Sequence, residues 1–224
     1  MKASLDTNVI IHLYKANQQH ILFSLFGKNI FVYEFLVNQE LKTHGQDIMQ
    51  KFMDDVADGK ITIITDDYLK ECGIYFLFKS YYQEDRPLYN TGDTGEVYAI
   101  ALARTLGAMS IVTDDTKIGG PHATLMRLPS SDVIPFSFCE VLFLLFLENK
   151  VTINEILSTY NAVIEKSNDF FVSLKSEFEK FVKRFSLSPY SEREKQWMSD
   201  YCKSISVDFT KEIKTLKKEL KKIL

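Results

Sequence analysis

Residues 92–115, GDTGEVYAIALARTLGAMSIVTDD, read as a helix that leads directly into a short strand. The first half is rich in helix formers and carries Glu96 near its start. The second half is an apolar run, MSIVT, which ends in Asp114 and Asp115. A helix followed by a buried strand is half of a βαβ unit, so this stretch predicts an α/β fold with a parallel sheet.

The rest of the first 136 residues repeats this alternation. Short apolar runs at 3–5, 29–35, 61–65 and 109–113 predict four strands, and a fifth is expected in either LMRLP (125–129) or DVIPF (132–136). Helical patterns lie between them, and they predict a helix from about Asn8, one ended by Gly45, one ended by Gly59 and one over 66–82. We assign residues 1–150 to this domain.

The pattern changes at residue 151. TINE (152–155) has the spacing of a capping box, and apolar residues then recur at the helical period as far as Phe185. SLSPY (186–190) interrupts the pattern with Pro189, and SERE (191–194) predicts the start of a second long helix. Residues 151–224 are therefore expected to form a helical hairpin that packs on itself, on the α/β domain or on another chain, and we expect a homo-oligomer.

Composition limits the class of protein. The chain has 224 residues, of which 46% are hydrophobic and 25% charged, as in globular domains. No basic segment followed by an apolar stretch opens it, so we expect no signal peptide. The most apolar window, 133–147, is shorter than the ~20 residues that span a bilayer, so we expect no membrane segment. Three widely spaced cysteines without a CxxC pair argue against disulfides and zinc and favour a cytoplasmic protein.

Carboxylates gather at the predicted ends of the strands. Asp6 ends the first strand, Asp114 and Asp115 end the fourth, and Asp93 and Glu96 open the helix before that strand. Glu40 lies in the helix after the second strand. Ligands of open α/β sheets bind beyond the carboxyl ends of strands, so these acids share one pocket if the first and fourth strands are neighbours. Such a cluster needs a cation, and oxygen ligands suit Mg²⁺ or Mn²⁺ in phosphodiester hydrolysis.

Each acid also has a purely structural interpretation. Asp93 and Glu96 have the D-x-x-E spacing of a capping box. Asp114 and Asp115 can begin a turn, and Glu40 can be a solvated helix residue. Asp6 is harder to explain in this way, because a charge that closes a buried strand needs a partner.

Four segments in order resemble the PIN domain, a metal-dependent nuclease fold that includes VapC-type toxins. They are SLDTNVII (4–11), FLVNQEL (35–41), GEVYAIALARTLGA (95–108) and IVTDD (111–115). The resemblance covers residues 1 to about 136 and implies a three-layer α/β/α domain with sheet order 3-2-1-4-5. It also implies a single-stranded or structured RNA substrate, a role as the toxin of a toxin–antitoxin or related defence system, and an antitoxin or inhibitor protein as partner. The hairpin at 151–224 is not part of the family pattern.

The resemblance also implies roles for individual residues. The catalytic acids would be Asp6, Glu40, Glu96 and Asp115. Asp114 would join Asp6, Glu96 and Asp115 among the metal ligands. Auxiliary roles would fall to Asp93, Asn8 and Thr113.

Charge bears on how RNA would bind. Residues 1–150 carry 13 Lys and Arg against 19 Asp and Glu, whereas residues 151–224 carry 14 against 11. An acidic nuclease domain needs cations near the phosphates, and we expect Lys15, Arg104 and Lys117 to contact the substrate. The lysine-rich end, KEIKTLKKELKKIL (211–224), fits either a phosphate backbone or a solvated helix face.

The leading hypothesis is a Mg²⁺- or Mn²⁺-dependent endoribonuclease. The alternative is a non-catalytic PIN-like scaffold that assembles or binds a partner through its hairpin. A haloacid-dehalogenase-type phosphatase also begins with a strand ending in Asp, but its mechanism requires DxD, and Asn8 occupies the third position here.

Overall fold

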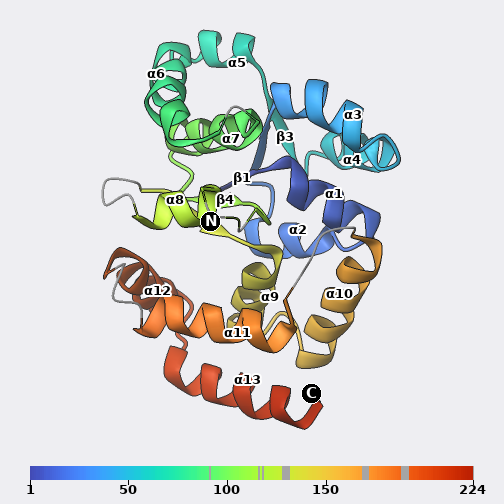
Figure 1. Ribbon diagram of the computed structural model, residues 1–224, viewed down its shortest axis with the longest axis vertical. Helices are drawn as coiled ribbons and strands as arrows, with labels where there is room; N and C mark the ends of the chain where they lie inside the picture. The colour runs from blue at the N-terminus through green and yellow to red at the C-terminus, as the bar shows by residue number, and fades with distance from the viewer. Residues whose placement is uncertain are drawn as a thin grey trace. The chain divides into compact units, whose positions relative to one another are not determined.

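The computed structural model describes residues 1–90, 92–115, 117, 119–127, 132–167, 172–187 and 192–223 (Figure 1). The chain divides into two compact units, Met1–Phe138 and Cys139–Leu224. The predicted domain boundary was at residue 150. The division falls earlier because the apolar helix that follows Phe138 packs its aromatic side chains within the second unit.

The first unit is built on a five-stranded, all-parallel sheet, which confirms the α/β class. The strands follow the order β3-β2-β1-β4-β5, as predicted. Their bounds are β1 (Ala3–Leu5), β2 (Ile30–Tyr33), β3 (Thr62–Ile64), β4 (Ser110–Val112) and β5 (Ile134–Phe136). Every residue of β1, β4 and β5 is buried, which agrees with a parallel sheet covered by helices.

Of the two alternatives for the fifth strand, 132–136 is the correct one. Residues 125–127 instead belong to the helix α8 (Pro121–Arg127), and 128–129 lie outside the described residues. Periodicity could not separate the two alternatives, because both are short apolar runs beside a proline.

The helices of the first unit connect successive strands. They are α1 (Thr7–Lys15), α2 (His20–Phe26), the π-helix η1 (Leu36–Leu41), α3 (Lys42–His44), α4 (Met49–Ala57), α5 (Asp66–Glu71), α6 (Tyr75–Asp85), the 3₁₀ turn η2 (Arg86–Leu88), α7 (Thr94–Thr105) and α8. Helix α7 packs against the central strands β1, β2 and β4, and α2 packs against β2 (Figure 1). The residues that follow β1 and β4 therefore meet the first turn of α7.

The helix predicted over 66–82 is two helices, so that prediction was wrong. Gly73 has a φ of +71°, which is the left-handed conformation that ends a helix, and α6 begins two residues later. Helix α5 is capped at its start by the Thr65 hydroxyl, which accepts a hydrogen bond from the Tyr68 amide.

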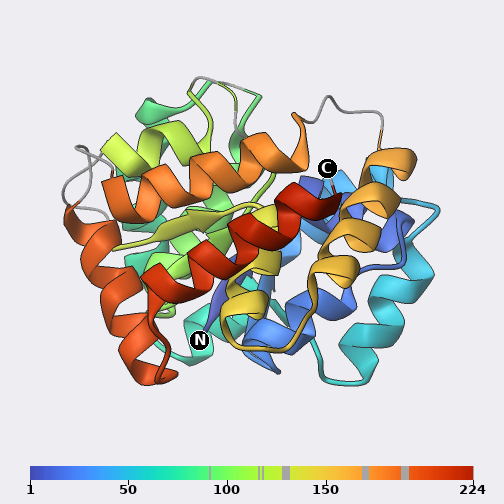
Figure 2. The same ribbon diagram turned by 90° about the horizontal axis from the view of Figure 1, so that it is seen from below.

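The second unit consists of helices joined by turns and loops in its described residues. It contains α9 (Phe138–Leu147), α10 (Ile153–Lys166), α11 (Leu174–Val182), the π segment η3 (Lys183–Leu187), α12 (Glu192–Ser204) and α13 (Phe209–Ile223). Figure 2 shows α13, in red, running beside α11, in orange. The capping box of Thr152 and Glu155 is formed as predicted.

The prediction of a hairpin made of two continuous helices was wrong, because each arm contains two helices: α10 and α11 in the first, and α12 and α13 in the second. In the first arm, helix α10 ends at the C-cap residue Ser167, and helix α11 begins after Ser173, whose hydroxyl caps it. The second arm breaks at Ser206, whose φ is +57°, and the Asp208 carboxylate then accepts a hydrogen bond from the Lys211 amide to start α13. Of the predicted interruption, 186–190, Ser186 and Leu187 belong to η3, whereas 188–190 and the predicted helix start at residue 191 lie outside the described residues.

The core of the second unit contains a buried ion-pair triad that the sequence pattern did not indicate. Arg184 donates to both carboxylate oxygens of Glu140, at 2.7 and 2.9 Å, and to Glu194, at 2.5 and 2.9 Å. Phe143 packs on Phe178 and Phe181 in the same core. Among the described residues, no helix combines the length and the apolar composition that crossing a bilayer requires.

Candidate metal centre

Asp6 occupies the point where β1 ends and α1 begins. It is the N-cap of α1: its Oδ1 accepts from the Thr7 amide at 2.8 Å. Its Oδ2 accepts from the Thr113 hydroxyl at 2.9 Å, which is possible because β1 pairs with β4. The residue is only 2% exposed. The Thr113 hydroxyl also accepts from the Asp115 amide, so one threonine ties Asp6 to Asp115.

Three carboxylates converge on the same edge of the sheet. Asp93 precedes α7, Glu96 lies in its first turn, and Asp115 follows β4. Each offers an oxygen within 4.8 Å of the others, and all three are buried. This buried triad can hold a metal ion.

The capping-box interpretation of Asp93 and Glu96 does not hold. Asp93 stands at the N-cap position of α7, but its side chain accepts no hydrogen bond from the helix. Instead, Asp93 Oδ1 accepts from the Lys117 ammonium group at 2.9 Å. Its Oδ2 is buried and has no hydrogen-bond partner among the described residues. A buried carboxylate oxygen without a donor is costly unless a cation or solvent satisfies it.

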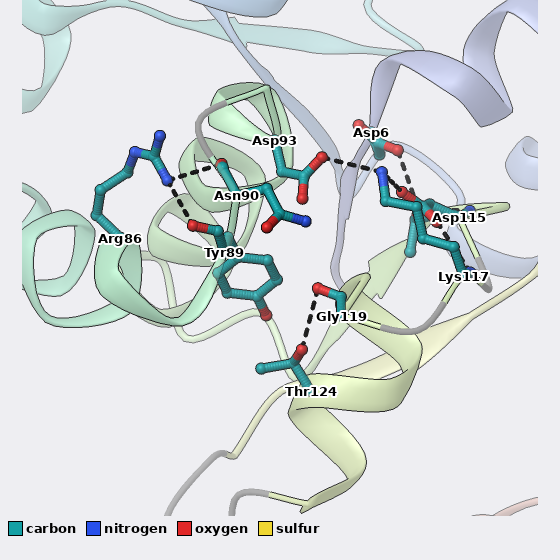
Figure 3. Close-up of polar contacts among 10 residues, drawn as sticks. Asp6, Arg86, Tyr89, Asn90, Asp93, Asp115, Lys117, Gly119 and Thr124 are labelled. Atoms are coloured by element: carbon teal, nitrogen blue, oxygen red, sulfur yellow. Dashed lines mark hydrogen bonds and ion pairs between the residues drawn. The ribbon is translucent and has the colours of Figure 1, made fainter.

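Lys117 lies between two of these acids (Figure 3). Its Nζ is 2.9 Å from Asp93 Oδ1 and 2.6 Å from Asp115 Oδ2. These hydrogen bonds raise the pKa of the lysine above its usual value, with the larger effect from Asp115. Half of the side chain is exposed, so the ammonium reaches the acids from the solvent side. The acids therefore already bind one positive charge.

Burial changes the acidity of this group. It raises the pKa of Asp6 well above the usual value, and the charges of Glu96 and Glu40 raise it further. It also raises the pKa of Glu96 to about 7, with contributions from Asp93 and Asp115 that Lys117 opposes. Full ionisation of the cluster therefore costs free energy that a bound cation would recover.

Glu40, in η1, is linked to Asp6 through Thr7. Its carboxylate accepts a hydrogen bond from the Thr7 hydroxyl, while the Thr7 amide donates to Asp6. Glu40 also approaches the first turn of α7, because Gly95 has no side chain there. A Cβ at Gly95 would lie 2.2 Å from Glu40 Oε1. Similarly, a Cβ at Gly120 would lie 2.8 Å from Asp115 Oδ1.

Arg86 stabilises the loop that carries Asp93 through hydrogen bonds to its backbone. The guanidinium Nη1 donates to the carbonyl oxygens of Tyr89 and Asn90 at 3.0 and 2.9 Å (Figure 3). The Asn90 carbonyl in turn accepts from the Asp93 amide at 3.1 Å. Three backbone-directed contacts therefore fix the position from which Asp93 enters the cluster.

Four predicted residues have other partners or positions. Both Asp114 oxygens are engaged, one with His12 Nδ1 at 2.8 Å and one with the Phe138 amide at 2.9 Å. Arg104 pairs with Asp85 and Glu84 at the far end of α7. The remaining two are Asn8, which is exposed in the first turn of α1, and Lys15, whose Nζ is 3.7 Å from Asp47.

An aromatic row joins Tyr98 of α7 to Tyr82 of α6 and to Phe35. Tyr98, two residues after Glu96, stacks on Tyr82 with ring centroids 4.2 Å apart and contacts Phe35 at 4.8 Å. The Lys79 ammonium lies 5.3 Å from the centre of the Tyr82 ring. All three rings are half-buried, so part of each remains accessible.

Sequence reasoning found the acids but missed the residues that arrange them. Thr7 and Gly95 are uncharged, so nothing in the sequence marks them as parts of a site. Arg86 is charged, but it does not follow a predicted strand. The only local indications were that Thr7 directly follows Asp6 and that Gly95 directly precedes Glu96.

Comparisons of this chain with protein-family models, with curated proteins and with solved structures yield no match.

Proposed function

We propose that this protein is a metal-dependent endoribonuclease of the PIN type that uses Mg²⁺ or Mn²⁺. The observation that carries the proposal is the cluster of buried carboxylates beyond the ends of β1 and β4. Asp6, Glu40, Glu96 and Asp115 are the four acids on which the sequence resemblance also rests. In open α/β sheets, ligands bind beyond the carboxyl ends of the strands where the strand order reverses, which here lies between β1 and β4.

The donor set fits a hard divalent cation. All candidate ligand atoms of the triad are carboxylate oxygens, which Mg²⁺ and Mn²⁺ prefer over nitrogen and sulfur. Asp93 Oδ2, which has no hydrogen-bond partner in the part of the chain that the structure describes, supplies a further oxygen. Asp93, Glu96 and Asp115 would hold the ion, with Asp6 and Glu40 beside them.

A divalent ion at such a centre would supply an activated water molecule and stabilise the leaving oxygen in phosphodiester hydrolysis. The chain's own residues have separate tasks. Thr7 and Thr113 keep Asp6 in one orientation through its two oxygens. Glu96, with a pKa of about 7, releases a proton when a cation binds near neutral pH. Lys117 is half exposed and can pair with a substrate phosphate instead of Asp93 and Asp115.

The aromatic row favours a single-stranded substrate. Bases of single-stranded RNA stack on tyrosine and phenylalanine rings, whereas bases in a duplex are not accessible for such stacking. Phe35, Tyr98 and Tyr82 provide adjoining rings, of which Tyr98 lies on α7, the helix that also carries Glu96, and Lys79 adds a positive charge.

The test is cleavage of a labelled single-stranded RNA by the full chain with Mn²⁺, with and without a chelator. We expect chelation, Asp6→Asn and Asp115→Asn each to lower the cleavage rate by about 100-fold or more. Asp67→Asn is the matched control: this aspartate is highly exposed, its only ion pair with a residue that the structure describes is with Lys70, and its substitution should leave the rate unchanged. Cleavage that survives chelation or Asp6→Asn would contradict the proposal.

Calorimetry of Mn²⁺ binding separates the enzyme from a non-catalytic scaffold. An enzyme should bind Mn²⁺, lose that binding in Asp115→Asn, and cleave RNA. A protein that binds Mn²⁺ through Asp115 but leaves RNA intact would favour the scaffold. The proposal also includes an antitoxin or inhibitor protein as partner, as the resemblance implies.

A further inference from the structure

A second candidate binding site lies within the Cys139–Leu224 unit and is independent of the proposed activity. Helices α11 and α13 form the walls of an open groove of about 750 Å³. Its floor is apolar and includes Phe178, Val182, Phe209, Ile213 and Leu220. The rings of Phe181 and Phe209, 6.2 Å apart, join the two helices behind it.

The rim of this groove is strongly basic. Five exposed lysines line it, against the single acid Glu179: Lys175, Lys183, Lys214, Lys217 and Lys221. None of the five forms an ion pair with any residue that the structure describes. By contrast, Lys180, on another face of α11, pairs with Glu177 at 2.9 Å. The groove thus offers unneutralised positive charge around an apolar floor.

The dimensions suit a helix. The lining residues extend from Lys175 to Ser186 on one wall and from Phe209 to Lys221 on the other. At 1.5 Å per residue each wall is about 16–18 Å long, or about three helical turns. Both walls present residues at helical spacing, as in grooves that accept an amphipathic helix through its apolar face.

We propose that this groove is the docking site for an acidic amphipathic helix of a partner protein. The apolar face of that helix would cover Phe178, Val182 and Ile213, and its acidic flanks would pair with the rim lysines. Charge complementarity of this kind selects the partner and orients it.

The same charges argue against other occupants. A second copy of this chain, placed symmetrically, would bring the lysines of one rim against those of the other. A bilayer requires a projecting apolar face, whereas the apolar residues here form the floor of a groove between two helices. An RNA backbone would pair with the lysines but leave the apolar floor uncovered.

The test uses a fluorescent synthetic peptide of about 14 residues, with leucines along one helical face and glutamates elsewhere. Its binding to the full chain is measured by anisotropy. A peptide of the same composition in shuffled order, without an apolar face, should bind at least about tenfold more weakly. Equal binding of the two peptides, or no binding of the first, would overturn the proposal.

Charge-reversal variants locate the site. Lys214→Glu/Lys217→Glu on α13, and separately Lys175→Glu/Lys183→Glu on the opposite wall, should each weaken peptide binding by about tenfold or more. The matched control, Lys28→Glu/Lys203→Glu, makes the same change in net charge at exposed positions outside the groove and should change affinity less than about twofold. Circular dichroism verifies that each variant is folded.

Single-stranded RNA and vesicles of anionic phospholipid are tested as competitors of the bound peptide. Neither should displace the peptide at physiological salt. If either one displaces it and loses its own binding in both groove variants, the site recognises that macromolecule and the proposal fails.

Discussion

Glu96 is the residue at which protonation, stability and the candidate metal centre are coupled. Burial raises its pKa from about 4.5 to about 7, so the folded first unit retains a proton that the unfolded chain has already lost. The folded state is therefore most favoured below pH about 4.5, and this contribution is lost as pH rises to about 7. Asp6, with its pKa raised in the same direction, acts with the same sign.

The pH dependence of the metal-free protein tests this coupling. With chelator present, raising the pH from about 4.5 to 7 should lower the free energy of unfolding of the first unit by up to about 3 kcal/mol through Glu96. Native-state hydrogen exchange of the β1 and β4 amides, corrected for intrinsic rates, measures it. Glu96→Gln should flatten the slope, whereas Glu71→Gln, at an exposed position, should not. Identical slopes for the wild type and Glu96→Gln would contradict the assignment.

Among individual residues, Asp6 and Asp115 were the most predictable from sequence. Each follows a short apolar strand, and the carboxyl ends of parallel strands gather at one edge of the sheet. Asp114 was less predictable, because adjacent residues after a strand point in different directions. Its carboxylate pairs with His12 and the Phe138 amide.

At the scale of elements, the close approach of η1 to α7 determines where Glu40 lies. The first turn of α7 admits a carboxylate because residue 95 is glycine. Glycine is unfavourable within a helix by about 1 kcal/mol relative to alanine, so its presence there needs a reason. The reason is room for Glu40.

Gly95→Ala separates site geometry from helix stability. The new Cβ would clash with Glu40 Oε1 and displace it, so we expect RNA cleavage to fall by about tenfold or more while α7 remains folded. Gly92→Ala is the matched control, because a Cβ there has open space around it. In a Glu40→Ala background, Gly95→Ala should have little further effect on the rate. An unchanged cleavage rate in Gly95→Ala would contradict the role of Glu40 in the candidate centre.

Sequence periodicity identified most elements but missed their interruptions. The strands and the helices ended by Gly45 and Gly59 lie close to their predicted positions. The breaks at Gly73 and Ser206 were missed, because the apolar pattern continues across both and only the backbone conformation changes. Serine in the left-handed region is uncommon, so no rule of composition indicates it.

At the scale of the whole molecule, the second unit depends on the buried triad of Arg184, Glu140 and Glu194. Arg184 is on η3, and its two partners are on α9 and α12, so one guanidinium joins three helical segments. Removal of a buried charge that neutralises two others is expensive, since the remaining charges stay buried without compensation.

Arg184→Met should destabilise the second unit by about 3–5 kcal/mol. Urea unfolding followed by the fluorescence of Trp197, which contacts Phe185 and Tyr201 in this unit, measures the loss. Lys180→Met, which removes a half-exposed lysine that pairs with Glu177, should cost less than about 1 kcal/mol. Adding Glu140→Met and Glu194→Leu to Arg184→Met should restore much of the stability. A loss no larger than that of Lys180→Met would contradict the role of the triad.

The sequence by itself determined the α/β class, the positions of the first four strands and the acids that follow β1 and β4, because hydrophobic periodicity and strand-end carboxylates are local signals. The sheet order followed from the resemblance to PIN domains and agrees with the structure. Only the tertiary structure decided that Thr7 and Thr113 orient Asp6, that Gly95 makes room for Glu40, and that Lys117, but not Arg104 or Lys15, reaches the acids. These depend on side-chain directions between segments distant in sequence, which no local pattern specifies.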